Sequence, residues 1–212
     1  MHHGIGWKEI FKDLFQFKKP ILGAENEYLA IKLLESVEVS TMRCAAYGKR
    51  GMDPSRQESF LVTEELAGMI SLEDFVKNAL FSGVRKDILS ALAVQLGVMH
   101  RSGLNHRDCY ICHFMLDPEK ALAGDVKLHV IDLHRAQIRQ KVPFRYLVKD
   151  VAGILFSSAD LKISRMEMLR FIRLYSNRPL AVELKENGKF WESVAGAARK
   201  LYFKEFGREM PF

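Results

Sequence analysis

The stretch NHRDCYICHF, residues 105–114, decides the fold that we expect for this chain of 212 residues. It is polar and irregular. It follows an apolar segment over residues 84–101 that predicts a long helix, which Gly103 ends. Residues 126–133 alternate well enough to predict a strand, with Asp132 near its end. The sequence therefore predicts two aspartates on neighbouring elements, one in the polar stretch and one at the strand.

Asp108 and Asp132 have the chemistry that phosphoryl transfer to a hydroxyl requires. One carboxylate orients the attacking hydroxyl and accepts its proton, and a second holds the magnesium that bridges the nucleotide phosphates. A loop of His106, Arg107 and Asp108 after a long helix, followed by a strand that ends in Asp, is the order found in protein-kinase-like enzymes. We therefore predict Asp108 as the catalytic base, with His106 and Arg107 beside it, and Asp132 as the metal ligand.

Two positions depart from the protein-kinase pattern. His113 stands five residues after the predicted base, where protein kinases have Asn, and Asp132-Leu133-His134 replaces Asp-Phe-Gly. We expect His113 to bind metal or a phosphate oxygen, although imidazole is a poorer magnesium ligand than an amide oxygen. A His-Arg-Asp triplet alone can also be a solvated loop with a local salt bridge, so the flanking elements and Asp132 carry the prediction.

The same stretch is open to a second interpretation. CYICH at residues 109–113 matches the attachment pattern of c-type haem, and with His106 it could hold zinc. Covalent haem needs an oxidising compartment, and the first residues do not read as an export signal. Structural zinc sites usually draw on two separated ligand pairs, and Cys44 is the only other cysteine. A metal- or haem-binding protein is therefore our third hypothesis, after a kinase and a non-catalytic binding protein. For Cys109 and Cys112 themselves, we favour two small buried residues beside a catalytic loop.

The remaining patterns predict an α+β fold with a small mixed part over residues 1–65 and a mainly helical part over residues 66–212. Ser71 is a plausible N-cap of a helix that begins at Leu72. Aromatic residues at helical spacing predict an amphipathic first helix over residues 7–15. Further helices are expected over residues 25–34, 145–156, 165–175 and 190–203, and strands over 41–47 and 59–63, with turns between them over 48–56.

Composition narrows the class of partner. The formal net charge is +6 with an isoelectric point near 9.2, which favours a nucleotide, nucleic acid, acidic glycan or anionic membrane as partner. No nucleic-acid-binding motif is present, so we expect no nucleic-acid partner. Three cysteines do not form a disulfide framework, which indicates a reducing compartment, and the longest apolar run, residues 88–99, is too short to span a bilayer. We therefore expect a cytoplasmic protein.

The chain also resembles a known family. The stretch NHRDCYICHF, together with VIDLHRAQ at residues 130–137, LGAENEYLAI at 22–31 and KDVAGILFSS at 149–158, is similar to the lipopolysaccharide core heptose(I) kinases. The resemblance implies a protein-kinase-like bilobal fold with ATP and Mg²⁺ as cofactors. It implies transfer of the γ-phosphate to the first heptose of the lipopolysaccharide inner core, at the cytoplasmic face of the inner membrane. The Trp/Phe-rich face and flanking lysines of the expected first helix favour peripheral membrane contact, whereas such a helix more often packs on its own domain.

Site residues follow from the same resemblance. It implies that Asp108 is the catalytic Asp and Asp132 the magnesium ligand. It also implies that Glu27 pairs with a nucleotide-binding lysine, and that Asp150 braces the catalytic loop from behind. The backbone of residues 64–66, with Glu64 and Leu66 at its ends, is expected to meet adenine. Two basic residues in the segment after the metal ligand, Arg135 and Arg139, are expected to meet the acceptor, because the inner core carries carboxylates and phosphates.

The start of the chain bears on the expected activity. In the family, the nucleotide-binding lysine lies just before the segment that matches residues 1–4, and the glycine-rich loop lies further upstream. We therefore expect an incomplete N-terminal lobe and weak or no kinase activity for these 212 residues, with a misplaced start codon as the first explanation. The alternative is a non-catalytic, kinase-like binding protein.

Overall fold

The computed structural model describes residues 11, 15, 23–53, 56–77 and 81–211, so the amphipathic helix expected over residues 7–15 lies almost wholly outside the described residues. The elements follow one another in this order: α2 (Glu25–Ser36), β1 (Cys44–Arg50), β2 (Glu58–Thr63), β3 (Ile70–Ser71), α3 (Leu72–Phe75), α4 (Phe81–Arg101), β4 (Leu104–Asn105), η1 (Ile111–His113), β5 (Phe114–Leu116), α5 (Pro118–Leu122), β6 (His129–Val130), η2 (Leu133–Arg135), β7 (Gln137–Ile138), α6 (Phe144–Ser157), η3 (Ala159–Leu161), α7 (Arg165–Ser176) and α8 (Leu180–Phe206).

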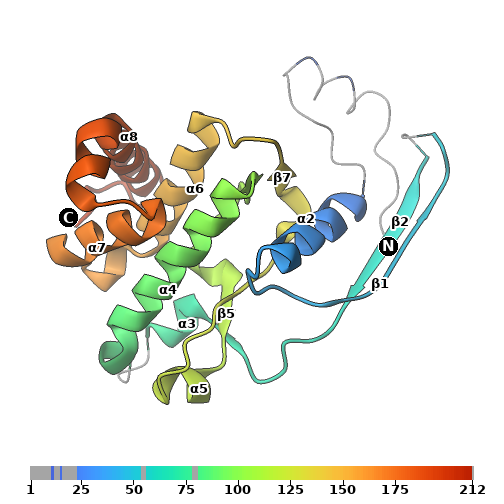
Figure 1. The fold of residues 1–212 in the computed structure, drawn as a ribbon, viewed down its shortest axis with the longest axis horizontal. Coiled ribbons are helices and arrows are strands. Elements are labelled where there is room, and N and C mark those ends of the chain that lie inside the picture. Colours follow the sequence, from blue (N-terminus) through green and yellow to red (C-terminus); the bar gives the residue numbers. More distant parts are fainter. Residues whose placement is uncertain (1–10, 12–14, 16–22, 54–55, 78–80, 212) are drawn as a thin grey trace.

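Strands β1 and β2 form an antiparallel hairpin that projects from one side of the helical part (Figure 1). Helix α2 packs on this hairpin. The ring of Tyr28 stacks on that of Tyr47 with centroids 4.2 Å apart, and the N–H of Ala24 donates to Ser59 Oγ at 2.9 Å. These contacts join α2 and the hairpin into one small α/β part.

The helical part is built around α4. One face of this helix is fully buried because apolar residues recur at helical spacing, with Ile88, Leu92, Leu96 and Met99 all at 0–1% exposure. Helix α7 packs along α4, and α8 packs on α6 (Figure 1). An ion pair ties α4 to α7, with Arg85 Nε 2.5 Å from Glu167 Oε1.

Two small sheets connect the helical part to the polar stretch. Strand β5, directly after η1, lies between β3 and β6, and β4 pairs with β7. Ser71 caps α3, because its Oγ accepts from the N–H of Asp74 at 3.0 Å. Gly103 ends α4 with φ +92°, and a Cβ there would lie 1.9 Å from the carbonyl oxygen of Arg139. The predicted cap and the predicted helix end are both confirmed.

Three predicted elements were wrong in extent. The strand predicted over residues 126–133 is reduced to β6, because the backbone turns left-handed at Asp132 (φ +59°) and enters η2. Strand β1 is shifted toward Arg50. Helix α8 begins ten residues before the predicted residue 190 and has non-helical angles at Asn187. The early part was missed because it buries Glu183, whose carboxylate is satisfied by Asn187 and Trp191.

The predicted division between residues 65 and 66 falls in the segment that joins β2 to β3. Two separate lobes stay a prediction. No helix within the described part of the chain is both long enough and apolar enough to cross a membrane.

Candidate functional site

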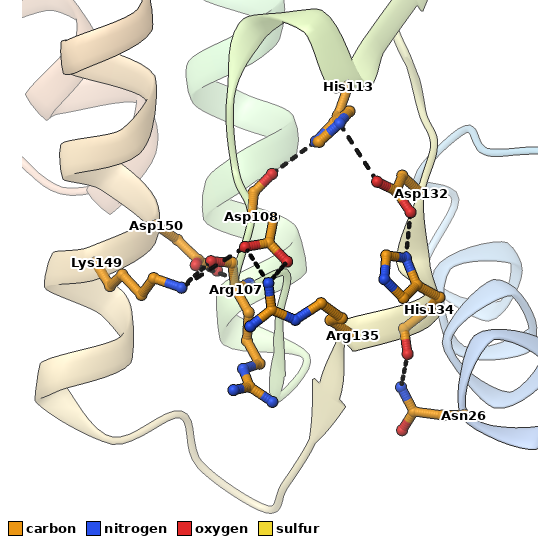
Figure 2. A network of polar contacts seen from close by, with 9 residues as sticks. All are labelled: Asn26, Arg107, Asp108, His113, Asp132, His134, Arg135, Lys149 and Asp150. Atoms are coloured by element: carbon orange, nitrogen blue, oxygen red, sulfur yellow. Dashed lines mark hydrogen bonds and ion pairs between the residues drawn. The ribbon is translucent and has the colours of Figure 1, made fainter. Parts of the chain in front are cut away.

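Asp150, on α6, holds the loop that carries the predicted base. Its Oδ2 accepts from the N–H of His106 at 2.6 Å, and its Oδ1 accepts from the N–H of Arg107 at 2.9 Å. Arg107 has φ +77°, a conformation that a non-glycine residue rarely adopts without such support. These are the contacts that a bracing residue requires, and Figure 2 shows Asp150 on α6 beside Arg107 and Asp108.

A buried chain of hydrogen bonds continues behind Asp150. His100 Nε2 lies 3.3 Å from Asp150 Oδ2, and His100 Nδ1 lies 2.8 Å from the hydroxyl of Tyr175. Burial raises the pKa of Tyr175, so its hydroxyl stays protonated and can donate to His100 Nδ1. His100 then donates from Nε2 to the carboxylate, and every member of the chain is satisfied. Sequence analysis did not identify His100 or Tyr175, because neither lies in the polar stretch.

Asp108 faces two cations. Arg135 Nη1 lies 2.9 Å from Asp108 Oδ1 and 2.8 Å from Oδ2, and Lys149 Nζ lies 3.8 Å from Oδ1 (Figure 2). The same ammonium donates to the carbonyl oxygen of Arg107. The structure thus brings Arg135, a predicted acceptor residue, onto the predicted base itself. Lys149 was not among the predicted site residues, although it directly precedes Asp150 in the sequence.

Asp132 lies between two imidazole rings (Figure 2). Its Oδ1 pairs with Nδ1 of His134, and its Oδ2 lies 3.4 Å from Nε2 of His113. His113 Nδ1 lies 2.7 Å from the carbonyl oxygen of Asp108, so that nitrogen must carry a proton and donate it. In neutral His113 the lone pair of Nε2 then points at the Asp132 carboxylate. Two acceptors so arranged need a cation or a proton between them.

Asp132 and His113 are therefore the residues that fit a metal ion. Both are partly exposed, with side-chain exposures of 37% and 22%. No group of three or more His, Cys, Asp or Glu side chains in the described part of the chain is arranged to hold a metal. Magnesium is commonly bound by one or two carboxylates together with substrate phosphates and water, so a small set of protein ligands is what a nucleotide-linked magnesium requires.

His106 has the geometry of a positioning residue. Its side chain is buried, and Nε2 donates to the carbonyl oxygen of Ile131 at 2.9 Å, which ties the loop to the residue before Asp132. Burial lowers the pKa of His106, and its Nδ1 has no hydrogen-bond partner among the described residues. The ring lies parallel to that of His113 with centroids 5.5 Å apart. A neutral, enclosed imidazole fixes the spacing of the two aspartates rather than carrying protons.

Helix α2 docks onto the segment after Asp132. Asn26 Nδ2 donates to the carbonyl oxygens of His134 and Ala136, at 2.9 and 2.5 Å. Glu27 follows directly on the same helix. Sequence analysis missed Asn26, although it lies inside the stretch LGAENEYLAI. Its two bonds fix α2 relative to the predicted metal ligand.

Residues 64–66, predicted to meet adenine, and Arg139, the second predicted acceptor residue, make hydrogen bonds to residues other than Asp108, His113 and Asp132. The N–H of Glu64 donates to the carbonyl oxygen of Arg43 at 2.9 Å, and Leu66 is half-buried. Arg139 donates to Asn105 Oδ1 at 2.7 Å and to Gln137 Oε1 at 2.6 Å. Its guanidinium also lies over the Tyr146 ring. Arg139 therefore fastens the two strands β4 and β7.

The interpretation of Cys109 and Cys112 as ligands of zinc or attachment points of haem finds no support in the described structure. Cys109 is buried, and burial raises the pKa of its thiol, which disfavours the thiolate that a metal needs. Cys112 is half-buried with its pKa also raised, and no metal-binding cluster includes either residue within the described ranges. Cys109 packs in the hydrophobic core directly after Asp108.

Comparison with known proteins gives a consistent match. The lipopolysaccharide kinase (Kdo/WaaP) family matches residues 1–175. The chain is 45% identical over 207 residues to the lipopolysaccharide core heptose(I) kinase WaaP of Pseudomonas aeruginosa, covering 95% of this chain and 77% of the relative. It is 39% identical over 205 residues to the WaaP of Escherichia coli, covering 94% and 77%. A solved structure described as WaaP in complex with acyl carrier protein superposes with a TM-score of 0.77 at 44% identity, covering 85% of this chain and 77% of that one.

Proposed function

The chain belongs to the lipopolysaccharide kinase (Kdo/WaaP) family, and we propose that it transfers the γ-phosphoryl group of ATP to a hydroxyl of the first heptose of the lipopolysaccharide inner core. The observation that carries the proposal is the placement of His113 between the two aspartates. Its Nδ1 bonds the backbone of Asp108, and its Nε2 faces the carboxylate of Asp132. One side chain thereby sets the distance between the predicted base and the predicted metal ligand.

Asp108 orients the acceptor hydroxyl and takes its proton as the new bond to phosphorus forms. The loop that presents it is fixed by the bonds from Asp150 to the backbone of His106 and Arg107. Fixed geometry matters here because catalysis of phosphoryl transfer comes almost wholly from positioning and electrostatics. Arg135 Nη1 lies 2.8 Å from Asp108 Oδ2 and holds the orientation of the carboxylate.

Asp132 and His113 would hold magnesium. When bound, the ion neutralises charge on the nucleotide phosphates. The carboxylate of Asp132 supplies the oxygen ligand, and the Asn26 bonds to the following segment keep that carboxylate in place. The left-handed backbone at Asp132 directs its side chain toward His113.

The nucleotide and acceptor contacts extend from the same centre. We assign adenine to the backbone of residues 64–66, and the nucleotide phosphates to the side of the site where Glu27 lies on α2. Arg135 meets an anionic group of the acceptor, since it stands beside the base with its side chain 43% exposed. Arg139 supports the acceptor side only indirectly, through β4 and β7. Because the acceptor is made at the cytoplasmic face of the inner membrane, we infer that the protein acts there and contacts the membrane peripherally. Sedimentation with anionic and with neutral liposomes tests this contact.

The test is transfer of labelled phosphate from γ-labelled ATP to lipopolysaccharide whose first heptose is unphosphorylated, with and without Mg²⁺. We expect weak but measurable transfer by the unaltered chain, and a further loss of at least about 100-fold for Asp108→Asn and Asp132→Asn. Asp125→Asn, at an exposed loop position, is the matched control and keeps activity. Nucleotide binding without any transfer by the unaltered chain would instead support the non-catalytic binding protein. The rate of transfer by the unaltered chain in the same assay tests the expectation that these 212 residues have weak or no kinase activity.

A second candidate function is binding of an acyl carrier protein, which the similar solved structure contains. The observation that favours it is a cavity of about 140 Å³ between α4, α6, α7 and α8, lined almost entirely by apolar side chains such as Phe81, Ile88, Phe171 and Trp191. An acyl chain is an apolar ligand that such a cavity could accept. Native mass spectrometry with acylated and unacylated carrier protein tests this, and equal binding of both would count against a role for the cavity.

A further inference from the structure

Two positive charges stand beside the single carboxylate of Asp108. Arg135 contacts both carboxylate oxygens, at 2.9 and 2.8 Å, and is the closer of the two cations. Lys149 Nζ lies 3.8 Å from Oδ1, which is beyond hydrogen-bond length. Arg135 and Lys149 therefore share one carboxylate, so the three groups together carry one positive charge in excess, next to the atom that takes the proton.

Lys149 is held at this place by the same elements that hold the base. Its ammonium donates to the carbonyl oxygen of Arg107, and its neighbour on α6, Asp150, accepts from the N–H of Arg107. Residue 107 is thus bonded to α6 twice, through its carbonyl oxygen to Lys149 and through its N–H to Asp150. The side chain is 45% exposed, so the lysine lies at the solvent side of the site and is not enclosed by the core.

We propose that Lys149 is a further catalytic residue, whose ammonium contacts the phosphoryl group during its transfer. This inference rests on the proposed function. A hydroxyl bonded to Asp108 places its oxygen about 2.7 Å from the carboxylate, and the phosphorus about 3–3.5 Å beyond it. The equatorial oxygens of the phosphoryl group then fall within reach of a lysine that already lies 3.8 Å from the carboxylate. A compact ammonium on a long stem suits a point contact of this kind.

The step balances without a proton from Lys149. The bond from the hydroxyl oxygen to phosphorus forms, the bond from phosphorus to the bridging oxygen of ADP breaks, and Asp108 receives the hydroxyl proton. Lys149 stays an ammonium throughout and stabilises charge on the equatorial oxygens. An anionic group of the acceptor could offer the same oxygens to the lysine, and the experiments below separate these two sources.

Steady-state kinetics of Lys149→Gln, Lys149→Met and Lys149→Arg give the first test. Lys149→Gln keeps a donor for the Arg107 carbonyl but removes the charge. We expect kcat to fall about 100-fold for Gln and Met and about tenfold or less for Arg, with both KM values within about threefold. Lys200→Met, an exposed position on α8, is the control and stays unchanged. Full activity of Lys149→Gln would overturn the proposal in favour of a structural hydrogen bond, and a rise in acceptor KM alone would assign the lysine to the acceptor.

Calorimetry with ADP and Mg²⁺, with and without aluminium fluoride, gives a readout independent of turnover, because the fluoride complex imitates the phosphoryl group in transfer. The unaltered chain and Lys149→Arg are expected to bind the fluoride complex more tightly than ADP. Lys149→Gln is expected to bind ADP as tightly as the unaltered chain does. The ratio of its affinity for the fluoride complex to its affinity for ADP is expected to be at least about tenfold smaller. Retention of the full gain in Lys149→Gln would refute the inference. Absence of ADP binding by the unaltered chain would instead refute the proposed function.

Discussion

Asp150 Oδ1 accepts a hydrogen bond from the N–H of Arg107 at 2.9 Å, across 43 residues of sequence, and this bond couples α6 to the loop of the predicted base. The other oxygen accepts from His106 and faces His100. The carboxylate is 1% exposed, so water cannot replace either bond. The conformation of the loop therefore depends on a side chain at position 150 that offers two acceptor oxygens.

We expect Asp150→Asn to lower the free energy of unfolding by about 1–3 kcal/mol and to abolish most of the activity. The amide has one acceptor oxygen, so its NH₂ group would face a backbone N–H that is left without a partner. Urea unfolding and the transfer assay measure the two effects. Asp160→Asn, at an exposed position, is the control. Unchanged stability of Asp150→Asn would show that the loop is held by other contacts.

Gly153→Ala is expected to disturb the same loop from the next turn of α6. A Cβ at this position would lie 2.4 Å from the carbonyl oxygen of Cys109, a backbone atom that cannot move alone. We expect a net loss of about 1–3 kcal/mol and a lower kcat, although Ala favours helix.

Gly196→Ala, on α8, is the matched control. A Cβ there meets no atom within 4 Å, so we expect a gain of about 0.5–1 kcal/mol from helix propensity alone. Thermal and urea unfolding of both variants check the pair. A stabilising effect of Gly153→Ala would mean that the loop lies further from α6 than the structure places it.

Arg135→Ala and Arg139→Ala are expected to act differently. Arg135 pairs with Asp108, so its loss is expected to lower kcat and raise the apparent KM for acceptor more than that for ATP. Arg139 joins Asn105 to Gln137 and covers Tyr146, so its loss is expected to reduce stability by about 1–2 kcal/mol with both KM values within about twofold. Steady-state kinetics and urea unfolding separate the two, and equal kinetic effects would contradict this assignment.

Acid is expected to weaken the ion pair between Arg85 on α4 and Glu167 on α7. Hydrogen bonding and charge pairing with Arg85 lower the pKa of Glu167 from 4.5 to about 2, despite partial burial. A carboxylate with a lowered folded-state pKa stabilises fully above its unfolded value, and that stability is lost as pH falls from about 4.5 toward 2. We expect a loss on the order of 2 kcal/mol across this window, allowing for partial exposure of the pair.

Arg85→Met tests the pH dependence, because without the guanidinium the pKa of Glu167 should return toward 4.5 and the acid-induced loss should shrink. Lys86→Met, an exposed neighbour on the same helix, should keep the full loss. Urea unfolding at several pH values between about 5 and 3 gives the comparison. Identical curves for Arg85→Met and the unaltered chain would place the acid-sensitive group elsewhere.

The sequence by itself determined the long helix α4, its end at Gly103, the cap at Ser71 and the two aspartates of the candidate site. Each depends on local chemistry, namely apolar periodicity, a positive φ, a capping hydroxyl or a motif of adjacent residues. The stretch NHRDCYICHF and its companions also identified the family, because their residue types are specific in combination. Local pattern failed at Asp132, where a left-handed backbone ends the strand early, and at Glu183, a buried carboxylate that resembles a surface residue in sequence.

Only the tertiary structure decided which side chains face the predicted base. Arg135 and Lys149 reach Asp108 or its loop from 27 and 42 residues away, whereas Arg139, equally basic in sequence, turns to β4 and β7. It also decided that His106 is buried and neutral while His113 looks toward Asp132. The physical reason is that charge and residue type are local properties, whereas partners are set by the packing of α6 and η2 around the loop.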